Sequence, residues 1–334
     1  MRITVIDQPR PGAASRASAG ILAPSIAGLP ESVRAAALEA RDLYPRYLEM
    51  LRDRTDIDVP LDRQGILELA VSEAELERSA ARAGPSAAHL DARALASLEP
   101  ALAVHAGAIH HPHDGAVDNV TLMAALDVAV ARHPRITRIT DEISSFDARG
   151  NLPAFLSRGG TRYASRRLLV ASGAWAGSLP GLPRPLPVRP VRGQLLRLEG
   201  LPIRHVVHLA DGYLVPRAGT LIVGATSEEV GFDSHTTPRG LATLRAIATR
   251  AVPVLGHAAV TDHWAGLRPI APDGVPIYGA DPAVPALAYA CGLSRNGVLF
   301  GPWAATQLAP LLAGGSVPPT LDPFRLDRLF QDTP

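Results

Sequence analysis

The chain begins with a short apolar strand pattern that leads directly into an acidic residue, and this order constrains the fold more than any other feature. Residues 3–6 are Ile-Thr-Val-Ile, Asp7 follows, and residues 12–20 are nearly all glycine, alanine and serine. In dinucleotide-binding units, an acid at a strand end binds the ribose about 20 residues after a glycine-rich phosphate turn. Only six residues precede Asp7, so the stretch is either the second half of such a site or an unrelated strand and loop.

Composition excludes several classes of function. The formal net charge is +1 and 19% of the residues are charged, which gives no electrostatic basis for binding nucleic acid. All 33 basic residues are arginine, so mechanisms that need a lysine Schiff base or a P-loop lysine are excluded. Cys291 is the single cysteine, which excludes an internal disulfide. No apolar run approaches the roughly 18 residues that span a bilayer, and we expect a cytoplasmic protein without membrane contact.

Helical and extended patterns alternate along the chain. Apolar spacing predicts helices over residues 32–54, 72–84, 119–133, 239–256 and 301–315. Ser72 and Glu75 match a capping box, and Asn119 is the expected cap of the helix that it begins. Strand and hairpin patterns cover residues 65–72, 106–118, 155–171, 193–200, 212–226 and 286–292. This order predicts an α/β fold with an added antiparallel sheet.

Three polar motifs have a structural interpretation that we favour over a catalytic one. The His-His-Pro-His-Asp motif at 110–114 is predicted to be a polar turn, because neighbours on a strand face opposite sides and do not converge on a metal. The glycines of the motif at 292–297 are spaced one residue too widely for a nucleophile elbow. Cys291 ends an apolar strand, which favours buried packing. We therefore predict no metal site and no serine or cysteine nucleophile.

Arg268 and the turn at 292–297 each have two interpretations. Arg268 lies between Leu267 and Pro269 in a mostly apolar segment, and a buried arginine needs a planar anion as its partner. That partner is either an internal Asp or Glu or the carboxylate of a substrate. The turn at 292–297 leads toward a helix whose N-terminus favours an electron-rich group, and an ordinary strand-to-helix turn has the same pattern.

Several motifs, in the order in which they occur, resemble one known family. They are GAASRASAGILAP (12–24), LLVASGAWAG (168–177), YLVPRAGTLIVGAT (213–226), HWAGLRPIAPDGVPIYG (263–279) and GLSRNGVLFGP (292–302). From its first residues to about Arg328, the chain resembles the D-amino-acid oxidase family of FAD-dependent oxidoreductases. Within that family it is most similar to the bacterial glycine oxidases of thiamine biosynthesis.

The resemblance implies a fold of two domains. One is an FAD-binding Rossmann-like domain of the glutathione-reductase type, formed by residues 1–57, 118–187 and 263–334. The other is an α+β substrate-binding domain with a mostly antiparallel sheet, formed by residues 58–117 and 188–262. The family's first strand, G-x-G-x-x-G turn and helix have no counterpart in this sequence. We therefore expect the given chain to be the tail of a longer protein.

The resemblance also implies site residues, with FAD as the cofactor. The substrate carboxylate is expected to bind Arg268, with Tyr213 and Arg295 beside it, and Asp211 stands where glycine oxidase has a histidine. No side chain is given a catalytic role, because hydride transfer to the flavin needs only positioning. The residues expected to bind FAD are Asp7, Gln8, Ala14, Ser15, Ala19, Gly20, Ile21, Ile143, Leu293, Ser294, Arg295, Asn296, Gly297, Val298 and Leu299.

The function implied is oxidative deamination of glycine or a small D-amino acid in thiamine biosynthesis. Its partners are the amino acid and O2, and its products are an imine that becomes a 2-keto acid, ammonia and H2O2. Alternatives within the family are a sarcosine or other secondary-amine oxidase and a quinone-linked D-amino-acid dehydrogenase. A different alternative is a truncated, non-catalytic protein that holds no FAD. A homo-oligomer is left open.

Overall fold

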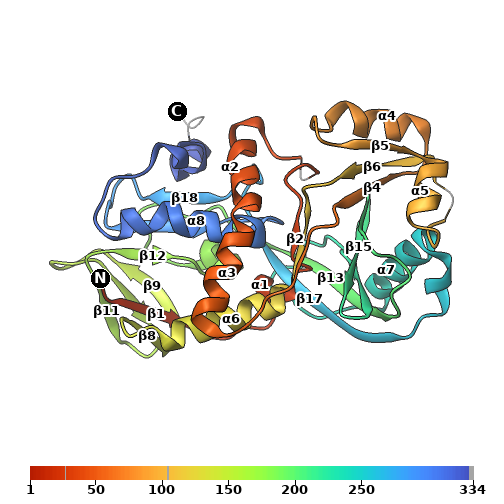
Figure 1. Ribbon diagram of the computed structural model, residues 1–334. Coiled ribbons are helices and arrows are strands. Elements are labelled where there is room, and N and C mark those ends of the chain that lie inside the picture. The colour runs from red at the N-terminus through yellow and green to blue at the C-terminus, as the bar shows by residue number, and fades with distance from the viewer. Residues whose placement is uncertain (27, 104, 331–334) are drawn as a thin grey trace.

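An eight-stranded sheet forms one lobe of the protein in the computed structural model, which describes residues 1–26, 28–103 and 105–330 (Figure 1). Every neighbouring pair in it is antiparallel except β14 and β4, which are parallel. The strands, in their order across the sheet, are β17 (Val260–Ile270), β13 (Arg189–Glu199), β16 (Thr220–Gly224), β15 (Gly212–Arg217), β14 (Val206–Leu209), β4 (Ile66–Ala70), β6 (Gly107–His111) and β5 (Ala88–Asp91). Helices α4 (Glu73–Arg82), α5 (Ala92–Leu98) and α7 (Pro238–Ala251) pack on this lobe.

The second lobe contains two separate parallel strand pairs. Strand β1 (Ile3–Asp7) pairs with β8 (Ile136–Thr140), and β12 (Leu168–Val170) pairs with β19 (Leu287–Cys291). On its other side, β19 pairs antiparallel with β18 (Ile277–Ala280). A further antiparallel sheet consists of β9 (Ile143–Asp147), β10 (Ala154–Ser157) and β11 (Arg162–Ala164). Short strands β2 (Ile21–Leu22), β3 (Leu61–Asp62) and β7 (Gly115–Val117) form a small sheet of their own.

Helices and aromatic side chains form the core of the second lobe. The helices are α1 (Ala14–Ala17), α2 (Glu31–Asp42), α3 (Tyr44–Thr55), α6 (Asn119–Arg132) and α8 (Gly297–Leu312). The rings of Tyr278, Phe300, Trp303 and Phe324 pack together with centroid separations of 5.4 to 6.4 Å. This cluster fixes α8, whose first residues then point toward the space between the lobes (Figure 1).

The predicted α/β fold with an antiparallel sheet is confirmed, and two local predictions are wrong. The helix predicted over 32–54 is two helices, α2 and α3, because Pro45 sits at the start of the second one and cannot continue the first. Helix α6 is capped by Asp118 rather than Asn119, since the Asp118 carboxylate accepts hydrogen bonds from the amides of Val120 and Thr121. The assignment of chain segments to two domains stays a prediction.

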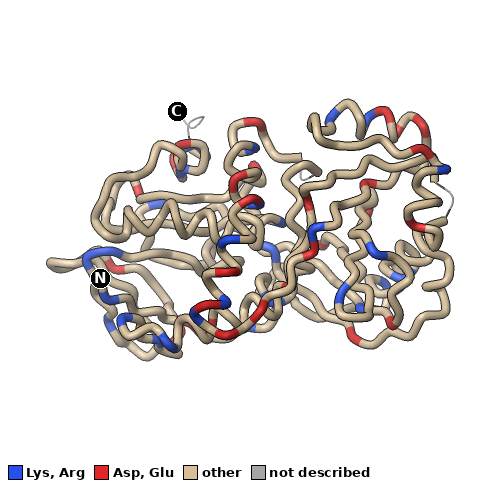
Figure 2. Tube along the Cα trace, in the orientation of Figure 1, with Lys and Arg blue, Asp and Glu red and all other residues tan. Residues whose placement is uncertain are grey.

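The capping box at the start of α4 forms one of its two usual hydrogen bonds, and the second is shifted by one residue. The Ser72 hydroxyl accepts from the Glu75 amide at 3.3 Å, while the Glu75 carboxylate accepts from the Val71 amide at 2.9 Å. None of the described helices is long and apolar enough to cross a membrane. Acidic and basic residues are interspersed along both lobes (Figure 2), in keeping with the small net charge.

Candidate cofactor and substrate site

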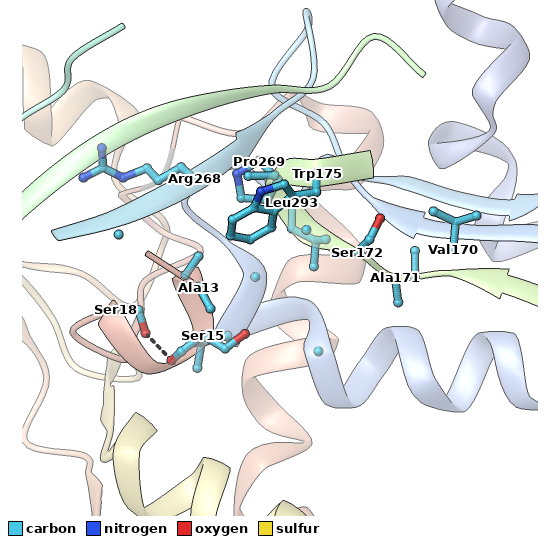
Figure 3. Close-up of a pocket in the computed structure, with 18 of the residues that line it drawn as sticks. Ala13, Ser15, Ser18, Val170, Ala171, Ser172, Trp175, Arg268, Pro269 and Leu293 are labelled. Carbon is cyan, nitrogen blue, oxygen red and sulfur yellow. Dashed lines mark hydrogen bonds between the residues drawn. The ribbon is translucent and has the colours of Figure 1, made fainter. Parts of the chain in front are cut away.

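A cavity of about 2770 Å³ runs between the two lobes and gathers nearly all the predicted site residues. Its wall includes β1, the end of β12, the turn before α8, and the loop of residues 13–20, here called the cofactor loop. Figure 3 shows Arg268 at one end, the strand end Val170–Ser172 at the other, and Ala13 and Ser15 of the cofactor loop between them. Of the residues that the resemblance implied, Leu299 alone does not line the cavity, because it faces the α8 core and is 1% exposed.

Arg268, on β17, has no carboxylate partner among the described residues. Its Nη1 donates to the carbonyl oxygens of Thr226 at 3.0 Å and Arg192 at 3.5 Å. Burial lowers the pKa of Arg268; the nearby Tyr213 opposes this shift and Arg295 adds to it, and an arginine stays charged under all such conditions. Of the two interpretations of Arg268, pairing with an internal Asp or Glu is therefore wrong for the part of the chain that the structure describes.

Two glycines on neighbouring strands make room for the side chains of Arg268 and Tyr213. A Cβ on Gly193 would lie 2.3 Å from Nη2 of Arg268, and a Cβ on Gly224 would lie 2.5 Å from the hydroxyl of Tyr213. Real Cβ atoms do not approach other heavy atoms this closely. The guanidinium and the phenol therefore lie flat against the backbone of β13 and β16.

His208 joins this cluster, although no sequence motif singled it out. It lies directly opposite Tyr213 in the β14–β15 register and lines the cavity. Burial lowers its pKa; Glu68 opposes the shift, and the charges of Arg295 and His111 add to it. His208 is therefore a neutral imidazole at neutral pH, and only the strand register could have revealed it.

Arg295 is held beside Arg268 by the turn before α8. The Ser294 amide donates to the Pro269 carbonyl at 2.8 Å, which ties this turn to the end of β17. No ion pair of Arg295 occurs within the described ranges, and its side chain lines the cavity. Burial raises the pKa of Tyr213, and the charges of Arg268 and Arg295 oppose that shift without reversing it. The cluster thus presents two guanidinium groups and a protonated phenol.

Asp211 also lines the cavity, but its carboxylate is already paired with an arginine. It accepts a hydrogen bond from Arg250 at 2.5 Å. Trp175 lines the cavity, stacks on Phe232 with a centroid separation of 5.7 Å, and carries the guanidinium of Arg10 at 5.4 Å from its ring. These side chains give the cavity wall aromatic as well as charged character.

Asp7 lines the cavity at the carboxyl end of β1. Its carboxylate accepts from Arg138 at 2.9 Å and remains half exposed. Gln8 and Ile143 line the cavity nearby. An acid at this end of a parallel strand has the place and chemistry of a ribose ligand.

The lining residues fit FAD as judged from their size and chemistry. The cofactor loop is built from small residues, so an elongated ligand can approach its backbone closely. At Gly20, whose φ is +74°, a Cβ would collide with the Val117 carbonyl at 1.9 Å, so glycine is required where the loop leaves the cavity. The 16-residue helix α8 starts at Gly297 on the wall and favours electron density there. Asp7, the cofactor loop and the start of α8 are the residues that would hold FAD.

The side chains of the motif at 110–114 make structural contacts, and Cys291 is buried. His110 bonds to the Gln64 carbonyl at 3.1 Å, His111 bonds to Glu68 at 3.0 Å, and Asp114 accepts from Ser25 and Arg41. Within the described ranges, no cluster of ligand-type side chains could hold a metal ion. Cys291 is fully buried, and burial raises its pKa to about 12. Its thiol is therefore protonated and inert.

Comparisons with known proteins match this geometry. The family model for FAD-dependent oxidoreductases, DAO, matches residues 1–311. The glycine oxidase of Geobacillus kaustophilus is 32% identical over 98% of this chain and 90% of its own length. The bifunctional protein ThiO/ThiG of Synechocystis is 34% identical over the whole chain, which spans about half (51%) of that relative.

Solved structures give the same result. The crystal structure of the Geobacillus kaustophilus glycine oxidase superposes with a TM-score of 0.91 at 31% identity, covering 98% of this chain and 92% of the other. That of the iminodiacetate oxidase from Chelativorans superposes with a TM-score of 0.89 at 26% identity, covering 98% and 93%. The fold class predicted from the motifs, with FAD as cofactor, is thereby confirmed. The chain belongs to the DAO family of FAD-dependent oxidoreductases and has the fold of its amino-acid oxidases.

Proposed function

We propose that the protein oxidatively deaminates glycine or a small D-amino acid. The observation that carries this proposal is the half-buried guanidinium of Arg268, which lacks a carboxylate partner among the described residues and lies at one end of the cavity. A planar cation of this kind is suited to bind a carboxylate through two parallel hydrogen bonds. The similarity of the chain to glycine oxidases supports an α-amino acid as the ligand.

Three groups of the chain would position the substrate. The Thr226 carbonyl holds one nitrogen of Arg268 at 3.0 Å and leaves the others for the substrate carboxylate. The Tyr213 hydroxyl keeps its proton, because burial raises its pKa, and can donate to a carboxylate oxygen. A carboxylate bound by both Arg268 and Tyr213 would have one orientation, and this would fix the direction of the adjacent Cα–H bond.

Bound FAD would supply the acceptor for the hydride of the Cα–H bond and pass two electrons and two protons to O2, giving H2O2. The amine loses a proton as the imine forms, and water hydrolyses the imine to a 2-keto acid and ammonia. No side chain is assigned as a base, because an amine that arrives neutral needs none. The chain's own contribution is therefore binding, orientation and exclusion of water.

A secondary amine with a second carboxylate is the other candidate substrate. Arg295 also lines the cavity, and no ion pair involves it in the described part of the chain. A second guanidinium beside the first favours a dianionic substrate, as an N-carboxymethyl amine would be. The similarity to an iminodiacetate oxidase supports this candidate.

A substrate panel separates these candidates. The protein loaded with FAD is assayed for H2O2 and ammonia with glycine, D-alanine, sarcosine and iminodiacetate. Preference for glycine supports the first proposal, and preference for iminodiacetate that disappears in Arg295→Gln supports the second. Reduction of a quinone without H2O2 would replace both with a dehydrogenase. The proposed role in thiamine biosynthesis is tested by rescue of a thiamine-requiring strain that lacks its glycine oxidase.

A further inference from the structure

We propose that Asn119, Arg217 and Trp264 are positioning residues that hold the cofactor loop in the shape that binds FAD. The inference rests on the proposed role of this loop in cofactor binding. None of the three side chains lines the cavity. They act from behind the loop, through its backbone oxygens.

Four carbonyl oxygens of the cofactor loop accept hydrogen bonds from these side chains. Asn119 Nδ2 donates to the carbonyls of Ser15 and Arg16 at 3.0 and 3.1 Å. Trp264 Nε1 donates to the Ala17 carbonyl at 2.7 Å, and Arg217 Nη2 donates to the Ala19 carbonyl at 2.8 Å. The short helix α1 ends at Ala17, so the carbonyls of its last residues lack partners within the helix, and that of Ser15 also accepts from the Ser18 hydroxyl at 3.4 Å.

The three donors come from three different elements, and two of them, Asn119 and Arg217, are hydrogen-bonded to each other. Asn119 begins α6, Arg217 ends β15, and Trp264 lies on β17. Arg217 Nη1 donates to Asn119 Oδ1 at 2.9 Å, and its Nη2 reaches the Val117 carbonyl at 3.0 Å. The nearest carboxylate, that of Asp118, lies 3.7 Å away. The Arg217 guanidinium is thus used mainly to bind backbone and amide oxygens.

These hydrogen bonds fix where the loop oxygens lie. An oxygen that is satisfied from behind the loop has no reason to turn toward the cavity, where its lone pairs would repel the oxygens of a phosphate or a flavin. Without the donors, each carbonyl would be freed to seek water in the cavity. We therefore expect the donors to affect FAD affinity through the shape of the loop.

The same strands also carry the substrate residues. Trp264, Gly266 and Arg268 alternate on β17 and share one face, as Tyr213 and Arg217 do on β15. Gly266 lets the loop pack closely, because a Cβ there would lie 2.7 Å from the Cβ of Ala17. The register of two strands thus places the substrate carboxylate relative to the cofactor loop.

Two conservative variants test the inference. Trp264→Phe removes the Nε1 donor and keeps a ring, and Asn119→Asp keeps the acceptor for Arg217 but replaces the amide donor with an oxygen. The matched control is Trp303→Phe, because Trp303 Nε1 donates to Glu39 at 3.1 Å in the α8 core, away from the loop. Each apoprotein is titrated with FAD by quenching of flavin fluorescence, its melting temperature is measured, and amide exchange of residues 13–20 is followed without FAD.

The inference predicts that Trp264→Phe and Asn119→Asp each raise the FAD Kd by about five- to ten-fold and speed exchange in the loop. Trp303→Phe should change the FAD Kd less than about two-fold, whatever its melting temperature. The loop variants could instead have a lower melting temperature but the same FAD Kd and the same amide exchange in the loop as Trp303→Phe. That result would overturn the inference and show that the residues stabilise only the fold. A wild-type protein that binds FAD but oxidises no amine overturns the proposed function alone. One that binds no FAD overturns both.

Discussion

The guanidinium of Arg268 lies flat against the backbone of Gly193, on the neighbouring strand. A Cβ at position 193 would lie 2.3 Å from Nη2 and 2.5 Å from Cζ of the arginine. Because β13 and β17 are paired along most of their length, neither backbone can move to relieve such a contact. The absence of a side chain at Gly193 therefore decides where the Arg268 guanidinium lies.

Gly193→Ala is expected to impair substrate binding selectively. The added methyl group would displace the Arg268 guanidinium, so KM for the amino acid should rise by about ten-fold or more, since a tenfold change needs only about 1.4 kcal/mol. The FAD Kd should stay within about two-fold of the wild-type value. Gly84→Ala is the control, because a Cβ there meets nothing within 4 Å. An unchanged KM in Gly193→Ala would show that Arg268 does not bind the substrate from its present position.

Tyr213→Phe is expected to raise KM while leaving FAD binding intact. The variant removes a hydroxyl that is available to donate to the substrate carboxylate, and a hydrogen bond to a charged group contributes about 1.5 to 3 kcal/mol. We therefore predict a rise in KM of roughly ten-fold or more. Steady-state kinetics of Tyr213→Phe and of the matched Tyr47→Phe check this. Equal KM values in the two variants would remove Tyr213 from the substrate site.

Cys291 is expected to be unreactive in the folded protein. Burial raises its pKa to about 12, so the nucleophilic thiolate is absent at neutral and mildly alkaline pH. A thiol reagent added to native protein should label it only at the rate of unfolding, and it should label one equivalent in denaturant. Rapid labelling of the native protein would show that this strand end is accessible.

Glu68 is expected to make stability depend on pH in the acidic range. Burial alone would raise its pKa, but hydrogen bonds from His111 and Ser79 and the charge of Arg82 outweigh burial and hold it at about 2, against 4.5 for the free residue. Because the folded pKa is depressed, the stabilisation is complete above about pH 4.5 and is lost as pH falls toward 2.

Glu68→Gln is the test of this pH dependence. At neutral pH it should lower the free energy of unfolding by about 3 kcal/mol, as expected for a buried pair that loses one partner. Urea unfolding should show that the difference in unfolding free energy between the variant and wild type shrinks as the pH falls from about 4.5 toward 2. A difference that is independent of pH would contradict the assigned pKa.

Motifs contiguous in sequence contain most of the predicted residues that line the cavity, and contacts between strands account for the lining residues they missed. The cofactor loop, the Arg268 segment and the turn at 292–297 are contiguous in sequence, so their residues could be assigned one by one. His208 and Gly193 act through strand register, and the donors behind the loop act through contacts between elements far apart in the chain. A single sequence shows neither directly.

Two sequence errors have equally local causes. A single helix was predicted where there are two, because the apolar periodicity continues across the break at Pro45 between α2 and α3. Asp118 replaced Asn119 as the cap because both side chains are good caps and only the backbone conformation distinguishes them. The two interpretations of Arg268 could be separated only by examining which carboxylates lie near it.

Arg268 is proposed to bind the substrate carboxylate beside the flavin. The most direct measurement is anaerobic mixing of the FAD-loaded protein with increasing glycine while the flavin absorbance is followed. We predict that wild-type flavin is bleached with saturation in glycine, and that Arg268→Ala needs about a hundred-fold more glycine at an unchanged FAD Kd, equivalent to about 2.7 kcal/mol. Bleaching with the same glycine dependence in both proteins would show that Arg268 does not bind the substrate.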